Sequence, residues 1–170
     1  MDVIMLEIER KWRLEKLPDC CLHENCFINS LRIEIDQGYI FEGPSSLRLR
    51  KSCTKSHRNY TMTVKGSGNL ARAEWETEIP KWVFDCLWKK VNHSLFKDRF
   101  KVPSADYVFE FDEYKLKLSG LLILECEFKS IEEANSFVLP DWIEGAVEVT
   151  KDPRYKNSNL AKLGSLEHLK

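Results

Sequence analysis

The stretch MLEIERKW, residues 5–12, decides how the rest of this chain is interpreted. Successive side chains of a β-strand point to opposite faces of a sheet. As a strand, this stretch has one largely apolar face, which holds Leu6, Ile8 and Trp12. The opposite face holds Glu7, Glu9 and Lys11. Two carboxylates and an ammonium group side by side suit an ordinary solvated surface, and they equally suit half of a metal-phosphate site.

The composition predicts a single globular domain. A chain of 170 residues can bury a substantial core. Hydrophobic residues make up 43% and charged residues 31% of the chain, against about 25% charged residues in a typical protein. We expect one domain over residues 1–165 and a short C-terminal tail over residues 166–170.

Charge and hydropathy argue against two classes of partner. Lys and Arg number 26 against 27 Asp and Glu, a net charge of -1, so the basic surplus typical of nucleic-acid binders is missing. No apolar run approaches the roughly 20 residues of a membrane span, and the acids and bases near the N-terminus do not fit a secretory signal. We therefore expect neither a nucleic-acid nor a membrane partner, and any cationic site must be a local concentration.

The six cysteines indicate a reducing compartment. No Cys-x-x-Cys pair exists, so a structural zinc site lacks its usual spacing. The cluster over residues 20–26 could bind a soft metal, although a buried or idle thiol is the commoner case. Cys86 and Cys126 fall on apolar faces and are expected in the core. Reduced thiols favour a cytoplasmic protein.

Period-2 segments recur along the chain, and their polar faces are sorted by charge. Two are basic, with Arg48 beside Arg50 and Lys97 beside Arg99. Two are acidic, with Glu110 beside Asp112 and Glu125 beside Glu127. Residues 72–79 place one arginine on a face with three glutamates. Apolar spacing and capping signals predict helices over residues 80–92, 130–139 and 158–163.

An antiparallel sheet with one wet face and helices on the other accounts for each segment taken singly. It does not account for the sorting, because strand-long blocks of one charge repel one another unless something lies between them. A metal cation would match the acidic strands, and a polyanion would match the basic ones.

The ordered set of motifs resembles the CYTH domain proteins, also called triphosphate tunnel metalloenzymes. Glu7-x-Glu9-x-Lys11 resembles the motif that defines this family. The resemblance continues through residues 48–50, 63–66, 72–76, 97–99, 110–112, 125–127 and 150–160, so it covers Leu6 to about Ala161. It implies an α+β, mainly β fold: a closed antiparallel barrel of about eight strands around a charged, hydrated tunnel, with helices packed outside.

The resemblance also implies roles for the charged residues. Phosphate binding is expected of Lys11, Arg48, Arg50, Lys65, Arg72, Lys97, Arg99, Arg154 and Lys156. Ligands for Mg²⁺ or Mn²⁺ are expected among Glu7, Glu9, Glu110, Asp112, Glu125 and Glu127. Catalytic roles are expected of Lys11, Glu9 and Tyr39. Tyr39 is equally well explained as a packed aromatic residue, and Arg72 and Arg154 as surface pairs. Glu74 and Glu76 are expected to line the wall and orient bases.

The family hydrolyses or cyclises triphosphates. This chain looks most like the single-domain bacterial inorganic tripolyphosphatases, which implies hydrolysis of tripolyphosphate to pyrophosphate and phosphate. A class IV-type adenylate cyclase and a thiamine triphosphatase are the alternatives within the family. A polyphosphate or nucleotide sensor would use the same tunnel without turnover, and an interaction module would bind neither metal nor phosphate. Family members also form homodimers, so a homodimer is a further expectation.

Overall fold

The computed structural model describes residues 5–19, 31–43, 45–68 and 70–169. Its strands are β1 (Met5–Leu14), β2 (Leu31–Glu42), β3 (Ser46–Cys53), β4 (Arg58–Lys65), β5 (Ala71–Glu78), β6 (His93–Ser104), β7 (Tyr107–Tyr114), β8 (Leu122–Glu127) and β9 (Val147–Glu148). The helices are α2 (Lys81–Trp88), α3 (Ile131–Ser136) and α4 (Asn157–Lys162), and the 3-10 turns are η1 (Leu116–Leu118), η2 (Pro153–Tyr155) and η3 (Leu166–Leu169).

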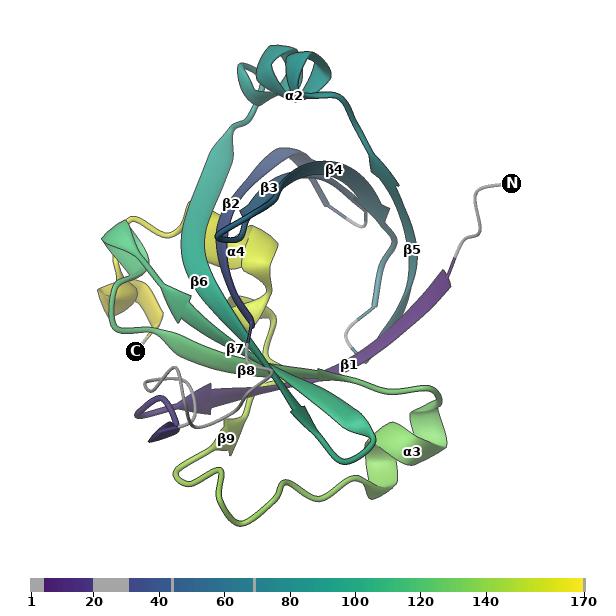
Figure 1. Ribbon diagram of the computed structural model, residues 1–170, viewed down its shortest axis with the longest axis vertical. Coiled ribbons are helices and arrows are strands. Elements are labelled where there is room, and N and C mark those ends of the chain that lie inside the picture. The colour runs from purple at the N-terminus through teal and green to yellow at the C-terminus, as the bar shows by residue number, and fades with distance from the viewer. Residues whose placement is uncertain (1–4, 20–30, 44, 69, 170) are drawn as a thin grey trace.

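The strands form a closed antiparallel barrel, as predicted (Figure 1). Their order is β5-β4-β3-β2-β6-β7-β8-β1-β9, and a further pairing of β5 with β1 closes the ring of β1 to β8. The short β9 lies outside this ring and pairs with β1 near Trp12. A closed ring leaves few unpaired strand edges.

Strand β1 closes the barrel by changing partner halfway along its length. Residues 5–8 pair with β5, and residues 9–14 pair with β8. The acidic and basic residues of β1 therefore lie where the first and last parts of the sheet meet. Alternation along the strand directs Glu7, Glu9 and Lys11 into the barrel and Ile8 and Trp12 outward.

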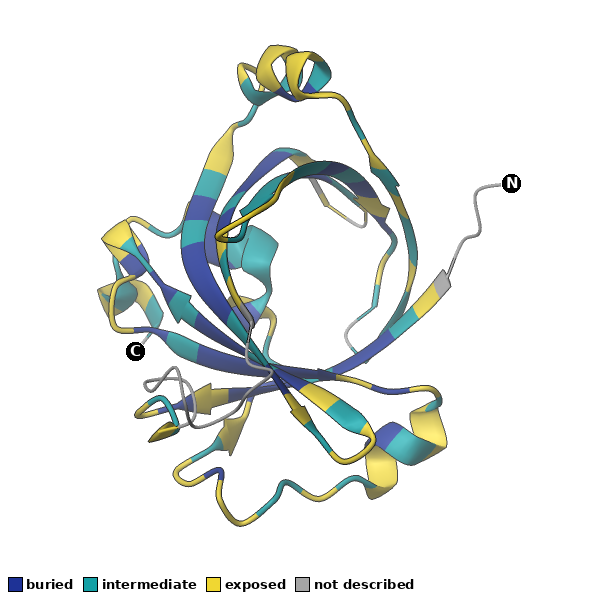
Figure 2. Cartoon of the chain, viewed as in Figure 1, coloured by how far each residue is buried: buried dark blue, intermediate teal, exposed yellow. Residues whose placement is uncertain are grey.

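Apolar side chains form two cores. One lies outside the barrel wall, and the other lies against the inward face of the strands, beside the charged part of the interior, and includes Tyr39. The first core joins Trp12, Phe109 and Phe111 to α3 and the chain that follows it. The second joins Tyr114 and Leu95 to the C-terminal elements, including Leu166 and Leu169 in residues 166–169. The barrel strands are largely buried, whereas α2 and many turns are exposed (Figure 2).

Two expected helices are shorter than the sequence pattern indicated. Helix α3 begins as predicted, since the Ser130 hydroxyl accepts a hydrogen bond from the Glu133 amide at 3.1 Å. It ends at Ser136, because Phe137 is extended. Arg10, the charged residue on the apolar face of β1, donates to the carbonyls of Ala134 and Phe137, both at 2.8 Å. These bonds satisfy carbonyls that the helix end leaves open.

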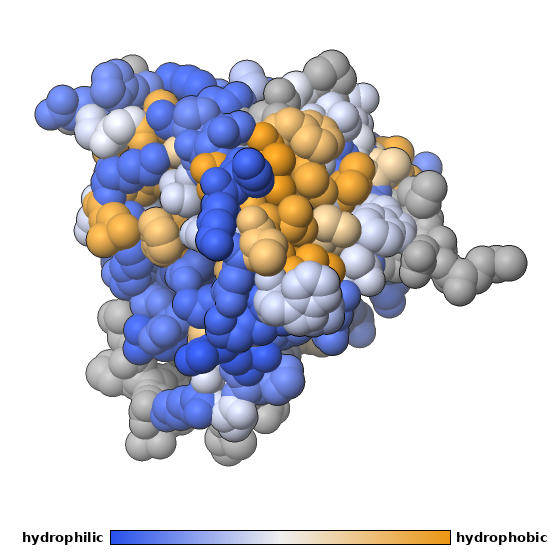
Figure 3. Space-filling view, turned by 90° about the horizontal axis from the view of Figure 1, so that it is seen from above, coloured by the Kyte–Doolittle hydropathy of each residue, from blue (hydrophilic) through white to orange (hydrophobic). Residues whose placement is uncertain are grey.

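Helix α2 ends at Trp88 and packs against β3 and β4. A Cβ at Gly38 would lie 2.7 Å from Val91, so glycine is what lets the chain after α2 approach β2. Seen from the α2 side, hydrophobic residues cluster beside a band of hydrophilic ones (Figure 3). Cys86 is exposed on this helix, so its expected place in the core is wrong, whereas Cys126 is buried as expected.

The predicted soft-metal cluster over residues 20–26 lies outside the described residues. No helix in the described ranges is long and apolar enough to cross a bilayer.

Candidate active site

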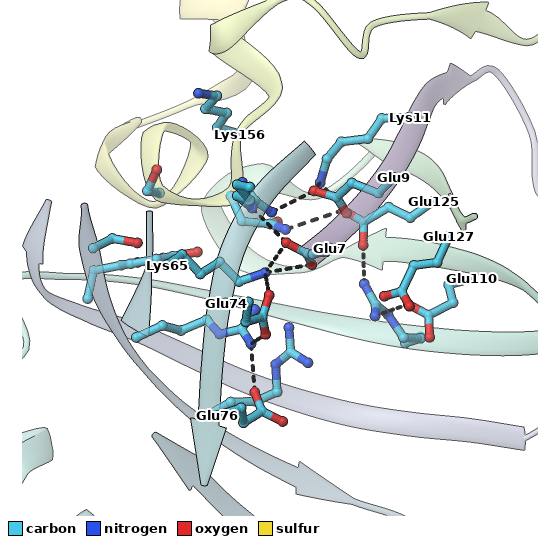
Figure 4. A pocket seen from close by; sticks show the side chains of 18 of the residues that line it. Glu7, Glu9, Lys11, Lys65, Glu74, Glu76, Glu110, Glu125, Glu127 and Lys156 are labelled. Atoms are coloured by element: carbon cyan, nitrogen blue, oxygen red, sulfur yellow. Dashed lines mark hydrogen bonds and ion pairs between the residues drawn. The ribbon is translucent and has the colours of Figure 1, made fainter. Parts of the chain in front are cut away.

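A cavity of about 180 Å³ runs inside the barrel, and its wall is almost entirely charged (Figure 4). Its lining contains seven glutamates, eight lysines and arginines, and four other polar residues. The glutamates are Glu7, Glu9, Glu74, Glu76, Glu110, Glu125 and Glu127, the cations are Lys11, Arg48, Arg50, Lys65, Arg72, Arg99, Lys101 and Lys156, and the others are Tyr39, Ser46, Asn157 and Ser158. Opposite charges are thus present in nearly equal numbers around one small space.

The residues around the β1 closure, here called the seam, are Glu7, Glu9, Lys11, Lys65 and Arg72. Glu7 accepts hydrogen bonds from Lys65 at 2.7 Å and from Arg72 at 2.6 Å. Arg72 also reaches Glu9 at 2.5 Å. Burial alone would raise the pKa of Glu7, but the charges of Lys65 and Arg72 hold it well below the ordinary value. Both carboxylates of the opening motif are therefore paired with cations of the neighbouring strands.

Lys11 lies between two carboxylates of the seam and of β8. Its Nζ is 3.3 Å from Glu9 and donates to Glu125. Burial favours the neutral amine, yet Glu125 and Glu9 outweigh it and raise the pKa of Lys11 above the ordinary value. The backbone amide of Lys11 is held by the Thr150 hydroxyl at 3.0 Å. Lys11 is thus a fixed ammonium ion at physiological pH.

The wall built by β3, β4 and β5 presents the two arginines of the Arg48-x-Arg50 motif. Arg48 donates to Thr63 and to Glu76, both at 2.9 Å, and lies 3.5 Å from Glu74. The expectation that Glu74 and Glu76 orient bases agrees with these contacts. Arg50 differs, because its hydrogen bonds go to the neutral side chain of Gln37.

On the opposite side, Arg99 is fixed by three carboxylates, those of Asp112, Glu110 and Glu125. Lys97 pairs with Asp112 beneath Arg99, and both of these side chains are 0% exposed. Neither Lys97 nor Asp112 lines the cavity. Strand alternation predicted their inward face correctly, but this sealed pair is buried behind the lining, and Asp112 accepts two hydrogen bonds from Arg99.

The C-terminal signature divides between the cavity and the surface. Lys156, Asn157 and Ser158 line the cavity, and the Lys156 ammonium donates to the Gly68 carbonyl at 3.0 Å. Arg154 is exposed outside the cavity and pairs with Asp152 at 2.7 Å. This position does not support the phosphate-binding role expected of Arg154, because the η2 turn directs its side chain away from the tunnel.

The sequence interpretation missed several lining residues. Lys101 continues the alternation of Lys97 and Arg99 along β6, so the same period-2 signal would have found it. Asn157 and Ser158 lie within the C-terminal signature, of which only Arg154 and Lys156 were expected to bind, and Ser46 shares its face of β3 with Arg48 and Arg50. Tyr39 lines the cavity as expected, and its hydroxyl accepts a hydrogen bond from Gln37 at 2.7 Å.

The donor set fits a hard divalent cation, because such ions bind carboxylate oxygens and retain water. Glu127 lies among other carboxylates of the cavity wall. Burial, followed by the negative charges of Glu110, Glu7 and Glu9, raises the pKa of Glu127 above the ordinary value. In the described chain, no three carboxylate, imidazole or thiol groups stand together ready to hold a metal ion. The carboxylates that would do so are turned toward arginines and lysines instead.

Known proteins with similar sequences and structures carry a common description. An inorganic triphosphatase from Nitrosomonas europaea is 37% identical over 162 residues, 92% of this chain and 97% of that protein. An inorganic triphosphatase from Acetivibrio thermocellus is 39% identical over 132 residues, 74% of this chain and 78% of that protein. A crystal structure of an inorganic triphosphatase aligns with a TM-score of 0.62 at 32% identity, over 95% of this chain and 97% of that chain. No protein-family model matches the sequence.

Proposed function

Because the chain belongs to the family of the inorganic triphosphatases, we propose that its tunnel hydrolyses inorganic tripolyphosphate to pyrophosphate and phosphate, with Mg²⁺ or Mn²⁺ as the cofactor. The composition of the cavity wall carries the proposal. Among the described residues, eight cations face seven glutamates there, and Tyr39 is the single aromatic residue of the lining. Such a wall suits a chain of phosphates and provides little surface on which a base or a thiazole ring would stack.

Binding exchanges one set of ion pairs for another. Guanidinium groups bind phosphate oxygens with two parallel hydrogen bonds, and ammonium groups act as point charges. A triphosphate would draw Arg48, Arg72 and Lys65 away from the glutamates that hold them at 2.6 to 2.9 Å. The released carboxylates are then available to a cation. Because the two charge sets are nearly equal, a metal-triphosphate pair replaces internal contacts without leaving a large uncompensated charge.

The metal ion would be held by the carboxylates that reach the cavity. Of the seven glutamates that line it, the candidates are Glu7, Glu9, Glu110, Glu125 and Glu127, whereas Glu74 and Glu76 contact Arg48. When bound, such an ion neutralises phosphate oxygens and lowers the pKa of a coordinated water. Asp112, although expected as a ligand, is left out of this set because it is sealed beneath Arg99.

Two side chains of the seam stabilise the attacked phosphoryl group and accept the proton of the attacking water. Lys11, fixed between Glu9 and Glu125, places a positive charge where the attacked phosphoryl group accumulates negative charge. A carboxylate oxygen of Glu9 accepts the proton of the attacking water, which is an in-line nucleophile. The arginines of the other walls hold the rest of the phosphate chain, so positioning and neutralisation provide most of the acceleration.

The size of the cavity supports an inorganic substrate. At about 180 Å³ it is smaller than the roughly 300–1,000 Å³ typical of pockets for drug-sized organic ligands. Tripolyphosphate is therefore favoured over ATP or thiamine triphosphate, each of which adds a large organic group.

The test is a substrate panel with product analysis, using purified protein with Mg²⁺ or Mn²⁺. We expect phosphate release from tripolyphosphate to be much faster than from ATP or thiamine triphosphate, and to stop on addition of EDTA. Glu78→Gln, an exposed carboxylate change on β5 outside the cavity, is the matched control and keeps full activity. Dominant cyclic AMP would make the protein a cyclase, and preferred hydrolysis of thiamine triphosphate a thiamine triphosphatase.

The non-enzymatic classes predict other outcomes of the same assay. Tight tripolyphosphate binding without metal-dependent turnover would indicate a sensor. No affinity for metal or phosphate would indicate an interaction module. The five candidate metal ligands among the cavity glutamates argue against both, since a pure anion binder gains nothing from them.

A homodimer and a cytoplasmic location belong to the same proposal. Phe41, Leu47, Val64 and Trp75 are direct neighbours across β2 to β5. Phe41 is 47% and Val64 37% exposed, so this row is an apolar surface suited to a second copy. Light scattering at micromolar concentration should give twice the chain mass, and a monomer mass would contradict the homodimer.

The free thiols of Cys53, Cys86 and Cys126 support the cytoplasmic location, because thiols stay reduced in that compartment.

A further inference from the structure

Gln37 lies on β2 between two residues of the cavity wall and is 0% exposed. Its Oε1 accepts hydrogen bonds from Arg50 Nε at 3.0 Å and from Arg50 Nη2 at 2.9 Å. Its Nε2 donates to the Tyr39 hydroxyl at 2.7 Å. Register explains the arrangement, since Gln37 pairs directly with Arg50 across to β3, and Tyr39 follows on the same face of β2.

The direction of these hydrogen bonds is fixed by chemistry. A guanidinium group has donors and no acceptor, so the amide oxygen of Gln37 must face Arg50. The amide nitrogen must then face Tyr39, whose oxygen accepts the bond. The hydroxyl hydrogen of Tyr39 is left to point away from Gln37. Tyr39 lines the cavity, so that hydrogen is available to an oxygen of a bound ligand.

The neutrality of Gln37 matters as much as its geometry. Arg48, Arg72 and Arg99 each form ion pairs with glutamates or aspartate. Within the described residues, no carboxylate forms an ion pair with Arg50, and Gln37 supplies its hydrogen bonds. Arg50 is therefore oriented while its positive charge remains uncompensated at short range, which suits a group that must bind an anion.

We propose that Gln37 is a positioning residue for the triphosphatase reaction: it presents the Tyr39 hydroxyl to a phosphate oxygen as a hydrogen-bond donor and keeps Arg50 oriented without neutralising it. The proposal rests on the proposed function. It gives Tyr39 the role of a donor to the substrate, which neither strand alternation nor the family motif assigns.

Replacing Gln37 by glutamate separates this role from simple packing. Glutamate has nearly the same shape but only accepts hydrogen bonds when ionised. It would pair with Arg50 as an ion and take the Tyr39 hydroxyl hydrogen for itself. We expect kcat to fall to the level of Tyr39→Phe, and KM for tripolyphosphate to rise roughly 10- to 100-fold, the range for a lost charge-assisted hydrogen bond. The melting temperature should not fall, because the new ion pair holds the strands together.

Further variants complete the test. Gln37→Leu frees Arg50 and Tyr39 together, so we expect a loss in kcat with a smaller rise in KM than in Gln37→Glu. The double variant Gln37→Glu/Tyr39→Phe should have the kcat of either single variant, because both remove the same hydrogen bond. Asp36→Asn changes the next residue of β2, which faces outward and pairs with Lys51 at 2.6 Å. It should match the wild type and controls for disturbance of the strand.

Wild-type kcat and KM in Gln37→Glu would overturn the proposal, as would additive losses in the double variant. Calorimetric titration with tripolyphosphate separates this proposal from the proposed function. If the wild-type protein binds tripolyphosphate but does not hydrolyse it, the proposed function alone fails, and weaker binding by Gln37→Glu still supports the role of Gln37 at Arg50. Equal binding by the two proteins would contradict that role. Absence of both binding and hydrolysis in the wild type would overturn both proposals.

Discussion

Two regions inside the barrel follow the same strand alternation but hold their charges in different ways. In the seam, all five side chains line the cavity and retain between 6% and 14% exposure. In the pair formed by Lys97 and Asp112, both side chains are 0% exposed and lie beneath the lining. The seam residues are in contact with the cavity space, whereas the Lys97–Asp112 pair is shut off from it. A side chain that points into the barrel therefore does not always line the cavity. How deeply the side chain is buried separates the lining residues from the residues that support them.

Substitutions in the seam are expected to change turnover more than any others. Glu9→Gln removes the proton acceptor and Lys11→Ala removes the fixed ammonium, so each should lower turnover by about 10²- to 10⁴-fold, the usual contribution of such groups. Circular dichroism and the melting temperature should show the fold intact. Tripolyphosphate turnover is the measurement, with Glu78→Gln as the control. Wild-type activity in both variants would show that Glu9 and Lys11 have no catalytic role.

The sealed pair should respond in stability first. Asp112→Asn leaves Lys97 and Arg99 buried together without their shared carboxylate, and breaking a buried pair in this way costs about 3–5 kcal/mol. Lys97→Met should cost much less, because Asp112 keeps its bonds to Arg99 at 2.7 Å. Urea unfolding of the two variants measures the difference. Equal stability would mean that the pair is not sealed from water.

The pH dependence of unfolding distinguishes the sealed lysine from those of the seam. Burial, with the charge of Arg99, lowers the pKa of Lys97 to about 8. An unfolded lysine titrates near 10.5, so between these values the unfolded chain binds more protons. Lys97 therefore makes the fold more stable as the pH rises through this window, by up to about 1.4 kcal/mol per pH unit.

The measurement is the free energy of unfolding of the wild type minus that of Lys97→Met, from chemical denaturation at several pH values. The difference should be flat below pH 8 and should rise above it. A flat difference throughout would show that Lys97 titrates normally and is in contact with solvent.

The smallest effect separates two basic residues of one turn. Arg154→Ala removes an exposed pair with Asp152, which solvent screens, and should leave kcat/KM within about twofold of wild type. Lys156→Ala removes a half-buried cavity cation and should raise KM for tripolyphosphate by about 3- to 10-fold, the range for one ordinary hydrogen bond, because water partly replaces the lost contact. Steady-state kinetics on the two variants checks the distinction. A larger loss of kcat/KM in Arg154→Ala would support the phosphate-binding role first expected of Arg154.

Alternation predicted the strands and the charged face of each one, because a strand of period 2 leaves a side chain only two directions, and the family resemblance supplied the closed barrel that turns these faces inward. The seam, both arginines of β3 and the acidic residues of β7 and β8 followed from the two together. Alternation has no information on depth, which is why Lys97 and Asp112 were grouped with the lining residues. It also fails in turns, where the direction of Arg154 depends on local backbone angles. Gln37 escaped notice because a lone amide on a polar face has no pattern until its neighbours across the strands are known.

The change of partner within β1 has a consequence for folding kinetics. The contact between Lys11 and Glu125 joins residues 114 positions apart, and contacts of such long range form slowly because the chain between them must first be ordered. Closing the ring and assembling the seam are the same event. We therefore expect any partly folded state with an open barrel to be inactive, so that recovery of turnover during refolding reports the completion of the last strand pairing.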